Sequence, residues 1–312
     1  MSQNLPVLKN GKPHVSYSEF STWMKCSYRH LLSYVLKVGK QLPSFALIYG
    51  NAQHDYLESF VTKRDDSVAR EICRQRLQAW RTENDAWFME NVEKVPELQK
   101  FDIEALVEKI SEIGQLSIEF LDRTFKNWQI LRAEDELYEP AHSNGGKEFR
   151  FKGFVDLVIV ADSKKKPSKK NPEQKKEVWL LDWKTTSRPW DAKKLRDPIV
   201  TYQLVLYKKF WLQKVVDLGI DAKEIRCGYI TILRESKKKN FYTFIPVSVG
   251  PVPTTRAQKQ IGDFIASMER GMAIKRRSES NCKFCEFAET PACPSVLQLN
   301  GGRPKDKSPP HL

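Results

Sequence analysis

The chain has 312 residues, and 52 Lys and Arg against 39 Asp and Glu give it a formal net charge of +13. This length allows a sizeable core in one or two domains, and the charge suits a polyanionic partner, nucleic acid before an anionic membrane. The sequence has no run of about 18 apolar residues and no secretory leader, so we expect a cytoplasmic protein without a membrane span. In a reducing compartment, the six cysteines favour metal or cluster ligation over disulfides.

The first part of the chain is predicted to be helical. Residues 1 to about 15 form a polar lead-in, followed by a helix from Tyr17 to about Val38 that Ser16 or Ser18 caps. A second helix follows Gly50, and a helical subdomain inserted before the sheet is expected over 67–84, 87–92 and 103–125. Burial preference assigns the large aromatic residues of this part to the core rather than to a base-stacking surface: Trp80, Trp87, Phe88, Phe120, Phe125 and Trp128.

The second part of the chain is predicted to form a sheet and two more helices. Asp197 and Pro198 fit the N-cap and the first position of the first of these helices. The lysine-dense segment 163–176 is predicted to be a solvated hairpin tip, which either touches a nucleic-acid backbone or serves as a spacer. No G-x-x-x-x-G-K-[ST] motif occurs, so no ATP-driven motor is expected. The predicted strands are 130–139, 149–161, 178–184, 226–234 and 241–249, and the predicted helices are 198–218 and 255–272.

Two of the predicted strands place carboxylates where they can meet. Asp156 lies within the apolar run 151–160, and the next strand ends in Asp182-Trp183-Lys184. Because side chains alternate faces along a strand, Asp182 and Lys184 share one face, and pairing of the two strands brings Asp156 beside Asp182. Carboxylate oxygens are the ligands that Mg²⁺ and Mn²⁺ prefer, and a neighbouring Lys can stabilise charge on a phosphate or help to position water.

The order and spacing of these residues resemble a known nuclease family. Asp156, Asp182-x-Lys184 and the helical pair Gln203-x-x-x-Tyr207, together with an upstream Gly50-Asn-Ala-Gln-His54, are similar to the RecB-type branch of the PD-(D/E)XK nuclease superfamily. That branch includes the CRISPR-associated four-cysteine exonucleases and the AddB nuclease domain. The Pro of the family name is absent, since Val155 precedes Asp156, and the RecB branch commonly tolerates this change.

The resemblance implies a role for each of these residues. Lys184, which forms the catalytic set with the two aspartates, would assist the attacking water or the charge of the transition state. Gln203 and Tyr207 would position the DNA backbone. Four groups would ligate Mg²⁺ or Mn²⁺: the side chains of His54, Asp156 and Asp182 and the main-chain carbonyl of Trp183. A further acidic group is expected from one of three neighbours that the sequence does not rank: Glu134, Asp135 or Glu136.

Four of the six cysteines form a candidate metal-binding set. Cys282-x-x-Cys285 and Cys293 supply three soft ligands, and Cys26 matches the family's single N-terminal ligand. Four thiolates suit either tetrahedral zinc or an iron–sulfur cluster, and the C-x-x-C pair does not discriminate between them. The resemblance favours a [4Fe–4S] cluster that ties the two ends of the chain together, with zinc as the alternative. The remaining two are expected to be buried small apolar residues: Cys73 and Cys227.

The expected fold is an α/β PD-(D/E)XK core of the restriction-endonuclease type, a mixed central sheet flanked by helices, with a helical insertion and an iron–sulfur cap. Five parts are expected along the chain: an N-terminal helical segment with one cluster cysteine (1–49), the His-motif helix and helical insertion (50–130), the nuclease core (131–250), the C-terminal helix and cysteine cluster (251–299) and a disordered tail (300–312).

The resemblance implies a metal-dependent DNA exonuclease that acts at single- or double-stranded DNA ends in recombination, repair or phage genome processing. A phage-encoded enzyme would work in the host cytoplasm, and its protein partner would be a recombination, single-strand-binding or helicase protein. Three rivals stay open: a non-cleaving DNA-binding clamp or complex subunit of the same fold, a CRISPR-adaptation nuclease that trims DNA for an integrase partner, and an RNA-directed nuclease. The full set of site residues argues against the clamp.

Overall fold

The computed structural model describes residues 14–38, 45–94, 96–99, 101–144, 147–164, 175–236, 240–283 and 285–294. The chain divides into two compact units. The terminal unit contains Met1–Leu42, Leu137–Gly153 and Pro251–Leu312, and the sheet unit contains Pro43–Glu136 and Phe154–Gly250. Most of the predicted lysine-rich hairpin tip and all of the predicted disordered tail lie outside the described residues. Within the described part of the chain, no helix is both long and apolar enough to cross a membrane.

The terminal unit joins segments from both ends of the chain. Phe264 is fully buried, and its ring centroid lies 5.4 Å from that of Trp23 and 5.1 Å from that of His30. The predicted N-terminal cap is Ser16, whose side chain accepts a hydrogen bond from the N–H of Glu19 at 3.3 Å. The elements of this unit are β1 (His14–Ser16), α1 (Tyr17–Lys25), α2 (Ser27–His30), η1 (Leu31–Val35), α10 (Pro251–Arg270), α11 (Glu279–Cys282) and the first part of β3 (Lys147–Asp162).

The sheet unit is built on a mixed sheet, as the sequence predicts. The later part of β3 runs antiparallel to β4 (Lys176–Thr186), β4 runs parallel to β5 (Ile225–Leu233), and β5 runs antiparallel to β6 (Tyr242–Val247). β2 (Gln129–Asn144) pairs with β3. The structure adds a short strand, β1, where the sequence predicts only a polar lead-in, because three residues that pair in parallel with β3 leave no periodicity to detect.

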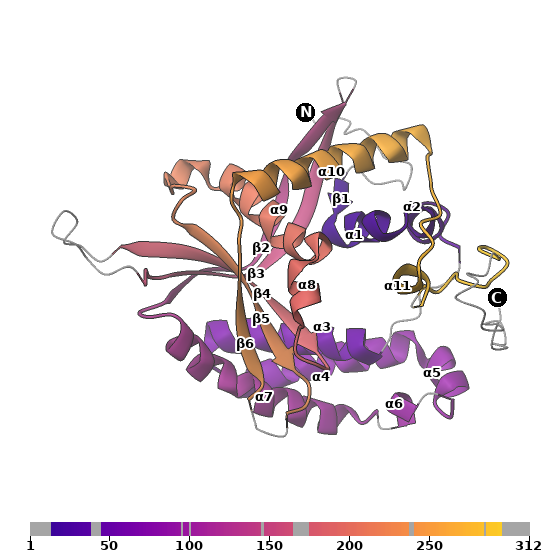
Figure 1. The fold of residues 1–312 in the computed structure, drawn as a ribbon. Coiled ribbons are helices and arrows are strands. Elements are labelled where there is room, and N and C mark those ends of the chain that lie inside the picture. The colour runs from indigo at the N-terminus through magenta and orange to yellow at the C-terminus, as the bar shows by residue number, and fades with distance from the viewer. Residues whose placement is uncertain are drawn as a thin grey trace, which may run out of the picture. The chain divides into compact units, whose positions relative to one another are not determined.

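Helices cover both faces of this sheet (Figure 1). Leu181 and Trp183 of β4 pack into a core cluster with α3 (Phe45–Lys63), α4 (Asp66–Glu83) and α7 (Ile103–Thr124). On the other face, the Tyr229 hydroxyl of β5 donates to the carbonyl of Val200 in α9 (Pro198–Lys214). The shorter elements of this unit are α5 (Asp85–Asn91), α6 (Pro96–Gln99), α8 (Ala192–Arg196) and η2 (Val216–Leu218).

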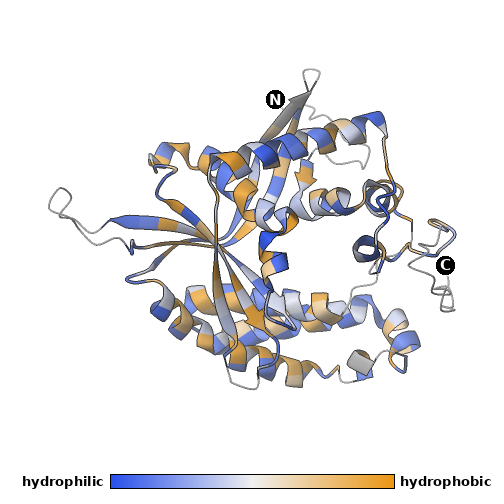
Figure 2. Ribbon diagram, viewed as in Figure 1, coloured by the Kyte–Doolittle hydropathy of each residue, from blue (hydrophilic) through white to orange (hydrophobic). Residues whose placement is uncertain are grey.

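Local sequence signals explain where these helices begin and how closely they pack. Asp197 accepts a hydrogen bond from the N–H of Ile199 at 2.8 Å, and Pro198 occupies the first turn, which confirms the predicted start of α9. Hydrophilic and hydrophobic residues alternate along α4 and α7 (Figure 2), as expected for helices with one buried face. Gly114 lets α7 approach α3, because a β-carbon there would lie 2.1 Å from the ring of Tyr56.

Candidate active site

The pairing of β3 with β4 brings two carboxylates to one place. Leu157 and Leu181 lie opposite each other in this ladder, and the next residue on each strand is Asp156 and Asp182, respectively. The Oδ2 atom of Asp156 accepts a hydrogen bond from the N–H of Trp183 at 2.7 Å. The Trp183 side chain lies in the core cluster on the opposite face, so the predicted alternation along Asp182-Trp183-Lys184 is confirmed.

Lys184 neutralises one of these carboxylates. Its Nζ atom lies 2.5 Å from Oδ2 of Asp182, whose side chain is only 1% exposed. Burial raises the pKa of Asp182 and that of Asp156 to about 6, and it does so against the favourable charge of Lys184. Burial also acts to lower the pKa of Lys184, but the two carboxylates outweigh it and raise that pKa. The site therefore holds a charged ammonium beside two carboxyl groups that resist carrying two negative charges.

His54 reaches the same place from α3. Its Nδ1 atom lies 3.4 Å from Oδ2 of Asp156. Burial, with a further contribution from the charge of Lys184, lowers the pKa of His54 to about 4. The imidazole is therefore neutral at neutral pH, the form in which histidine binds metals.

Gln203 and Tyr207 lie together behind Asp182. The Gln203 side-chain amide donates to Oδ1 of Asp182 at 2.8 Å and to the Tyr207 hydroxyl at 3.1 Å. Tyr207 is buried, and this burial raises the pKa of its hydroxyl above the ordinary value. Gln203 and Tyr207 therefore share one helix face, as the sequence predicts, and their polar groups orient Asp182.

The structure separates the three acidic residues that the sequence left unranked. Asp135 is buried and accepts hydrogen bonds from Trp211 Nε1 at 2.9 Å and from Lys214 Nζ at 2.5 Å, so it ties β2 to α9. Glu134 has a φ of 44°, and burial together with the charges of Asp156 and other nearby carboxylates raises its pKa to about 8. Of the triplet, Glu134 is therefore the member on which the charges of the site act.

Sequence reasoning missed one further acidic neighbour, Glu58. Burial and then the charge of Asp55 raise its pKa, and Glu58 in turn raises the pKa values of Glu134 and Asp156. Its position four residues after His54 on one helix face was the available signal.

The four predicted cluster cysteines all lie in the terminal unit. Cys26, Cys282, Cys285 and Cys293 line one small cavity of about 30 Å³ and are all half-buried. Burial raises the pKa of the Cys285 thiol. Cys73 and Cys227 are buried elsewhere, as predicted.

Neither group of residues forms a finished coordination sphere. Among the described residues, no three His, Cys, Asp or Glu side chains are arranged to hold a metal ion. The donor types fit nonetheless: oxygen ligands at the carboxylate site suit a hard divalent cation, and four thiols suit zinc or an iron–sulfur cluster.

Comparison with known proteins agrees with the fold. A family model described as the PD-(D/E)XK nuclease superfamily matches residues 14–294. The chain belongs to this superfamily and is a nuclease. The crystal structure of a "Putative exonuclease" from Eubacterium rectale is similar in fold, with a TM-score of 0.50 and 12% sequence identity over 93% of this chain and 91% of that chain. No curated protein matches the chain.

The raised carboxyl pKa values predict how pH changes the effect of a divalent metal on stability. Asp156 and Asp182 hold protons up to about pH 6 in the metal-free fold but only to about pH 4 when unfolded, so metal-free stability falls as pH rises through that window. A cation needs deprotonated ligands, so excess Mn²⁺ should raise Tm little at about pH 5 and more above about pH 6. Thermal unfolding with Mn²⁺ and with EDTA across this range measures the difference. The same Tm gain at both ends would contradict the prediction, and Asp156→Asn should lose the gain.

Proposed function

We propose that this nuclease is a metal-dependent DNA exonuclease of the RecB type, which hydrolyses phosphodiester bonds at DNA ends. The observation that carries the proposal is the meeting of Asp156, Asp182, Lys184 and His54 at one place in the sheet unit. This donor set fits Mg²⁺ or Mn²⁺, since it offers two carboxylates and a neutral imidazole.

Each residue has a task in hydrolysis that follows from its position. Asp156, Asp182 and His54, with the main-chain carbonyl of Trp183, would hold the cation, which when bound activates water and offsets charge on the phosphate. Lys184 keeps its proton beside Asp182, so it can orient the attacking water or stabilise the charge that develops on the phosphate. Gln203 holds Asp182 through its amide, and contact of Gln203 or Tyr207 with the DNA backbone stays a prediction.

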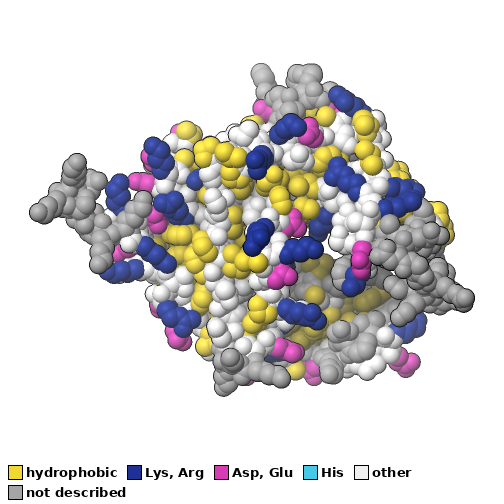
Figure 3. Space-filling model, in the orientation of Figure 1, with side chains coloured by type: hydrophobic (Ala, Val, Ile, Leu, Met, Phe, Trp, Pro, Cys, Tyr) yellow, Lys and Arg dark blue, Asp and Glu magenta, His cyan; other side chains and the backbone are white. Residues whose placement is uncertain are grey.

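Charge and family membership support the choice of DNA as the substrate. A net charge of +13 favours salt-dependent, sequence-independent attraction to a phosphate backbone. Lys and Arg side chains are scattered over the visible face among acidic and apolar ones (Figure 3), which fits general rather than sequence-specific attraction. The structural neighbour is described as a "Putative exonuclease", which fits action at ends.

Digestion of end-labelled linear DNA and of closed circular DNA tests the proposal. Wild type should degrade linear DNA with Mg²⁺ or Mn²⁺, and EDTA or Asp182→Ala should abolish the reaction, because the substitution removes a buried ligand. The order in which label is released from each end gives the polarity. Cutting of circles would establish an endonuclease instead, binding without cleavage under any metal would establish a DNA clamp, and preference for ribose oligonucleotides would establish an RNA-directed nuclease.

We further propose that Cys26, Cys282, Cys285 and Cys293 bind a [4Fe–4S] cluster. Their shared cavity supports this, as does the way hydrogen bonds already hold the two ends of the chain together around it. The Arg276 guanidinium donates to the carbonyl of Met24 at 2.7 Å, and the Asn281 amide donates to that of Lys25 at 2.8 Å. Iron and acid-labile sulfide in anaerobically purified protein would support the cluster, whereas one zinc per chain would show that the four cysteines bind zinc instead.

A further inference from the structure

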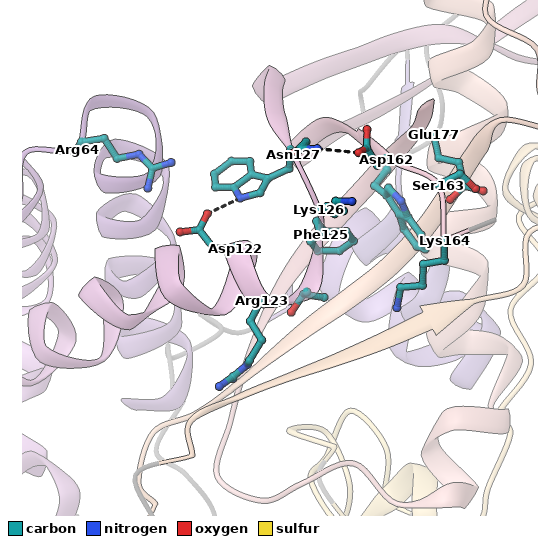
Figure 4. Close-up of a pocket in the computed structure, with 13 residues that line it drawn as sticks. Arg64, Asp122, Arg123, Phe125, Lys126, Asn127, Asp162, Ser163, Lys164 and Glu177 are labelled. Atoms are coloured by element: carbon teal, nitrogen blue, oxygen red, sulfur yellow. Dashed lines mark hydrogen bonds between the residues drawn. The ribbon is translucent and has the colours of Figure 1, made fainter. Parts of the chain in front are cut away.

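A second cavity lies in the sheet unit, away from the carboxylates. It has a volume of about 830 Å³ and is lined by the end of α7, the turn that follows it, the end of β3, the start of β4 and Arg64 after α3 (Figure 4). Asp162 in its wall lies six residues beyond Asp156 along β3, which at about 3.3 Å per residue places the cavity roughly 20 Å from the site. We call this cavity the distal pocket. Its volume is in the range of pockets that bind small molecules, about 300–1,000 Å³.

The distal pocket has a surplus of positive charge. Within the described part of the chain, the exposed side chains of Arg64, Lys126 and Lys164 make no hydrogen bond or ion pair. The lining carboxylates are engaged instead: Asp162 accepts from Asn127 at 2.8 Å and from Lys176 at 2.6 Å, Asp122 accepts from Trp128 Nε1 at 2.8 Å, and Glu177 accepts from Arg226 at 3.1 Å. Because Lys176 and Arg226 lie outside the lining, the cations that do line the pocket are left for an anionic ligand.

Aromatic rings accompany these cations. Trp128 and Trp179 are half-buried: both pack against the core cluster, and both also line the pocket. The guanidinium of Arg64 lies 5.2 Å from the centroid of the Trp128 ring, and the hydrogen bond to Asp122 fixes that ring. Half-buried aromatic rings next to unpaired cations are the combination that binds bases and phosphates of single-stranded nucleic acid.

The backbone supplies an independent observation. Arg64 and Asn127 both line the pocket, and both have positive φ, 58° and 49°. Arg64 follows α3 at a position where a left-handed residue ends the helix, and Gly is the residue usually found there. An arginine in this left-handed conformation has a strained backbone, whereas glycine would not. The strain places a guanidinium in the pocket, which indicates that the side chain has a function there.

We propose that the distal pocket is a second, non-hydrolytic binding point for single-stranded nucleic acid. One base stacks against the Arg64–Trp128 pair, and neighbouring phosphates contact Lys126 and Lys164. A single strand fits better than a duplex, because only an unpaired base can present its face to the indole. The choice of nucleic acid as the polyanion rests on the proposed function.

Binding of a fluorescent single-stranded oligothymidylate to the full chain in EDTA tests the pocket without cleavage. Trp128→Ala should weaken binding by about 5- to 150-fold, the usual effect of losing one stacked base, and Trp128→Phe should keep most of the affinity. Arg64→Gly should make the dependence of log Kd on log salt shallower by about 0.7 with an unchanged or raised Tm, which a purely structural arginine would not do. Lys94→Ala, which removes an exposed lysine that forms an ion pair with Glu90, is the matched control.

Two outcomes overturn the proposal: wild-type affinity and salt dependence in Trp128→Ala and Arg64→Gly, or a loss confined to duplex DNA. A dinucleotide is too short to span the roughly 20 Å between the pocket and the carboxylates. It should therefore bind the pocket variants less tightly than it binds wild type, and the same difference should appear when all proteins also carry Asp182→Ala. The two proposals can fail separately. Binding that depends on the pocket residues, without any cleavage, would support the distal pocket and reject the exonuclease. Cleavage together with binding that does not depend on the pocket residues would support the exonuclease and reject the distal pocket.

Discussion

Lys184→Met is expected to lower the rate of DNA cleavage by about 100-fold or more, while affinity for DNA changes little. The ammonium lies 2.5 Å from Asp182 and keeps its proton, so it is placed to act on the attacking water or on developing phosphate charge. Loss of one such preorganised group typically costs about 10²- to 10³-fold in rate. Single-turnover cleavage of end-labelled DNA measures the rate, and anisotropy in EDTA measures the affinity.

Stability gives this variant an internal check. Removing Lys184 leaves the buried Asp182 carboxylate without its charged partner, so metal-free Tm should fall, and excess Mn²⁺ should restore much of it. Lys94→Ala removes an exposed lysine of the same unit and should leave rate and Tm unchanged. Cleavage by Lys184→Met at the wild-type rate would remove Lys184 from the catalytic set.

The sequence predicts this site well because side chains alternate between the two faces of a strand, so the order of residues in a short segment determines which side chains share a face. Alternation along β4 separates Trp183 from Asp182 and Lys184, and simple pairing of two strands then places Asp156 beside them. The same regularity explains why the mixed sheet, the N-cap Asp197 and the helices on both faces could be predicted. Each of these features depends on residues within a few positions of one another or on one pairing.

Features that depend on three-dimensional detail could not be predicted. Glu134, Asp135 and Glu136 are consecutive acids, and the sequence does not show that Asp135 bonds to Trp211 and Lys214 while Glu134, which has a positive φ, feels the charges of the site. The distal pocket could not be predicted from the sequence for a related reason. Its members come from separate turns, and the sequence assigns Trp128 to the core because it is large and aromatic.

These placements distinguish two kinds of buried or half-buried acidic residue in the sheet unit. Asp135, bonded to an indole and an ammonium, is satisfied within the protein and serves the fold. Asp156, Asp182 and Glu134 crowd together with raised pKa values, an arrangement that costs stability in the absence of a cation. Clustering of carboxyl groups that repel one another is therefore the feature that marks the site as functional rather than structural.

Cys282→Ser is expected to remove the visible absorbance of the protein and to lower Tm by about 10 °C or more. Cys282 shares one small cavity with the three other candidate ligands, and thiolate-bound metal contributes on the order of 10 kcal/mol to folding in small sites of this kind. Absorbance, iron and sulfide content, and thermal unfolding of anaerobically purified protein measure the effect.

Cys73→Ala is the matched control, because Cys73 is buried in the core of the sheet unit and should keep the absorbance despite a modest loss of stability. The fold of the Cys282→Ser protein should survive in part, because the ion pair between Arg29 and Glu286 at 2.6 Å and the bonds from Arg276 and Asn281 still join the two ends of the chain. Loss of colour with a wild-type Tm would mean that the cluster adds nothing to this junction. A colourless wild type with stoichiometric zinc would assign the four thiolates to zinc, whose closed tetrahedral shell the same residues can complete.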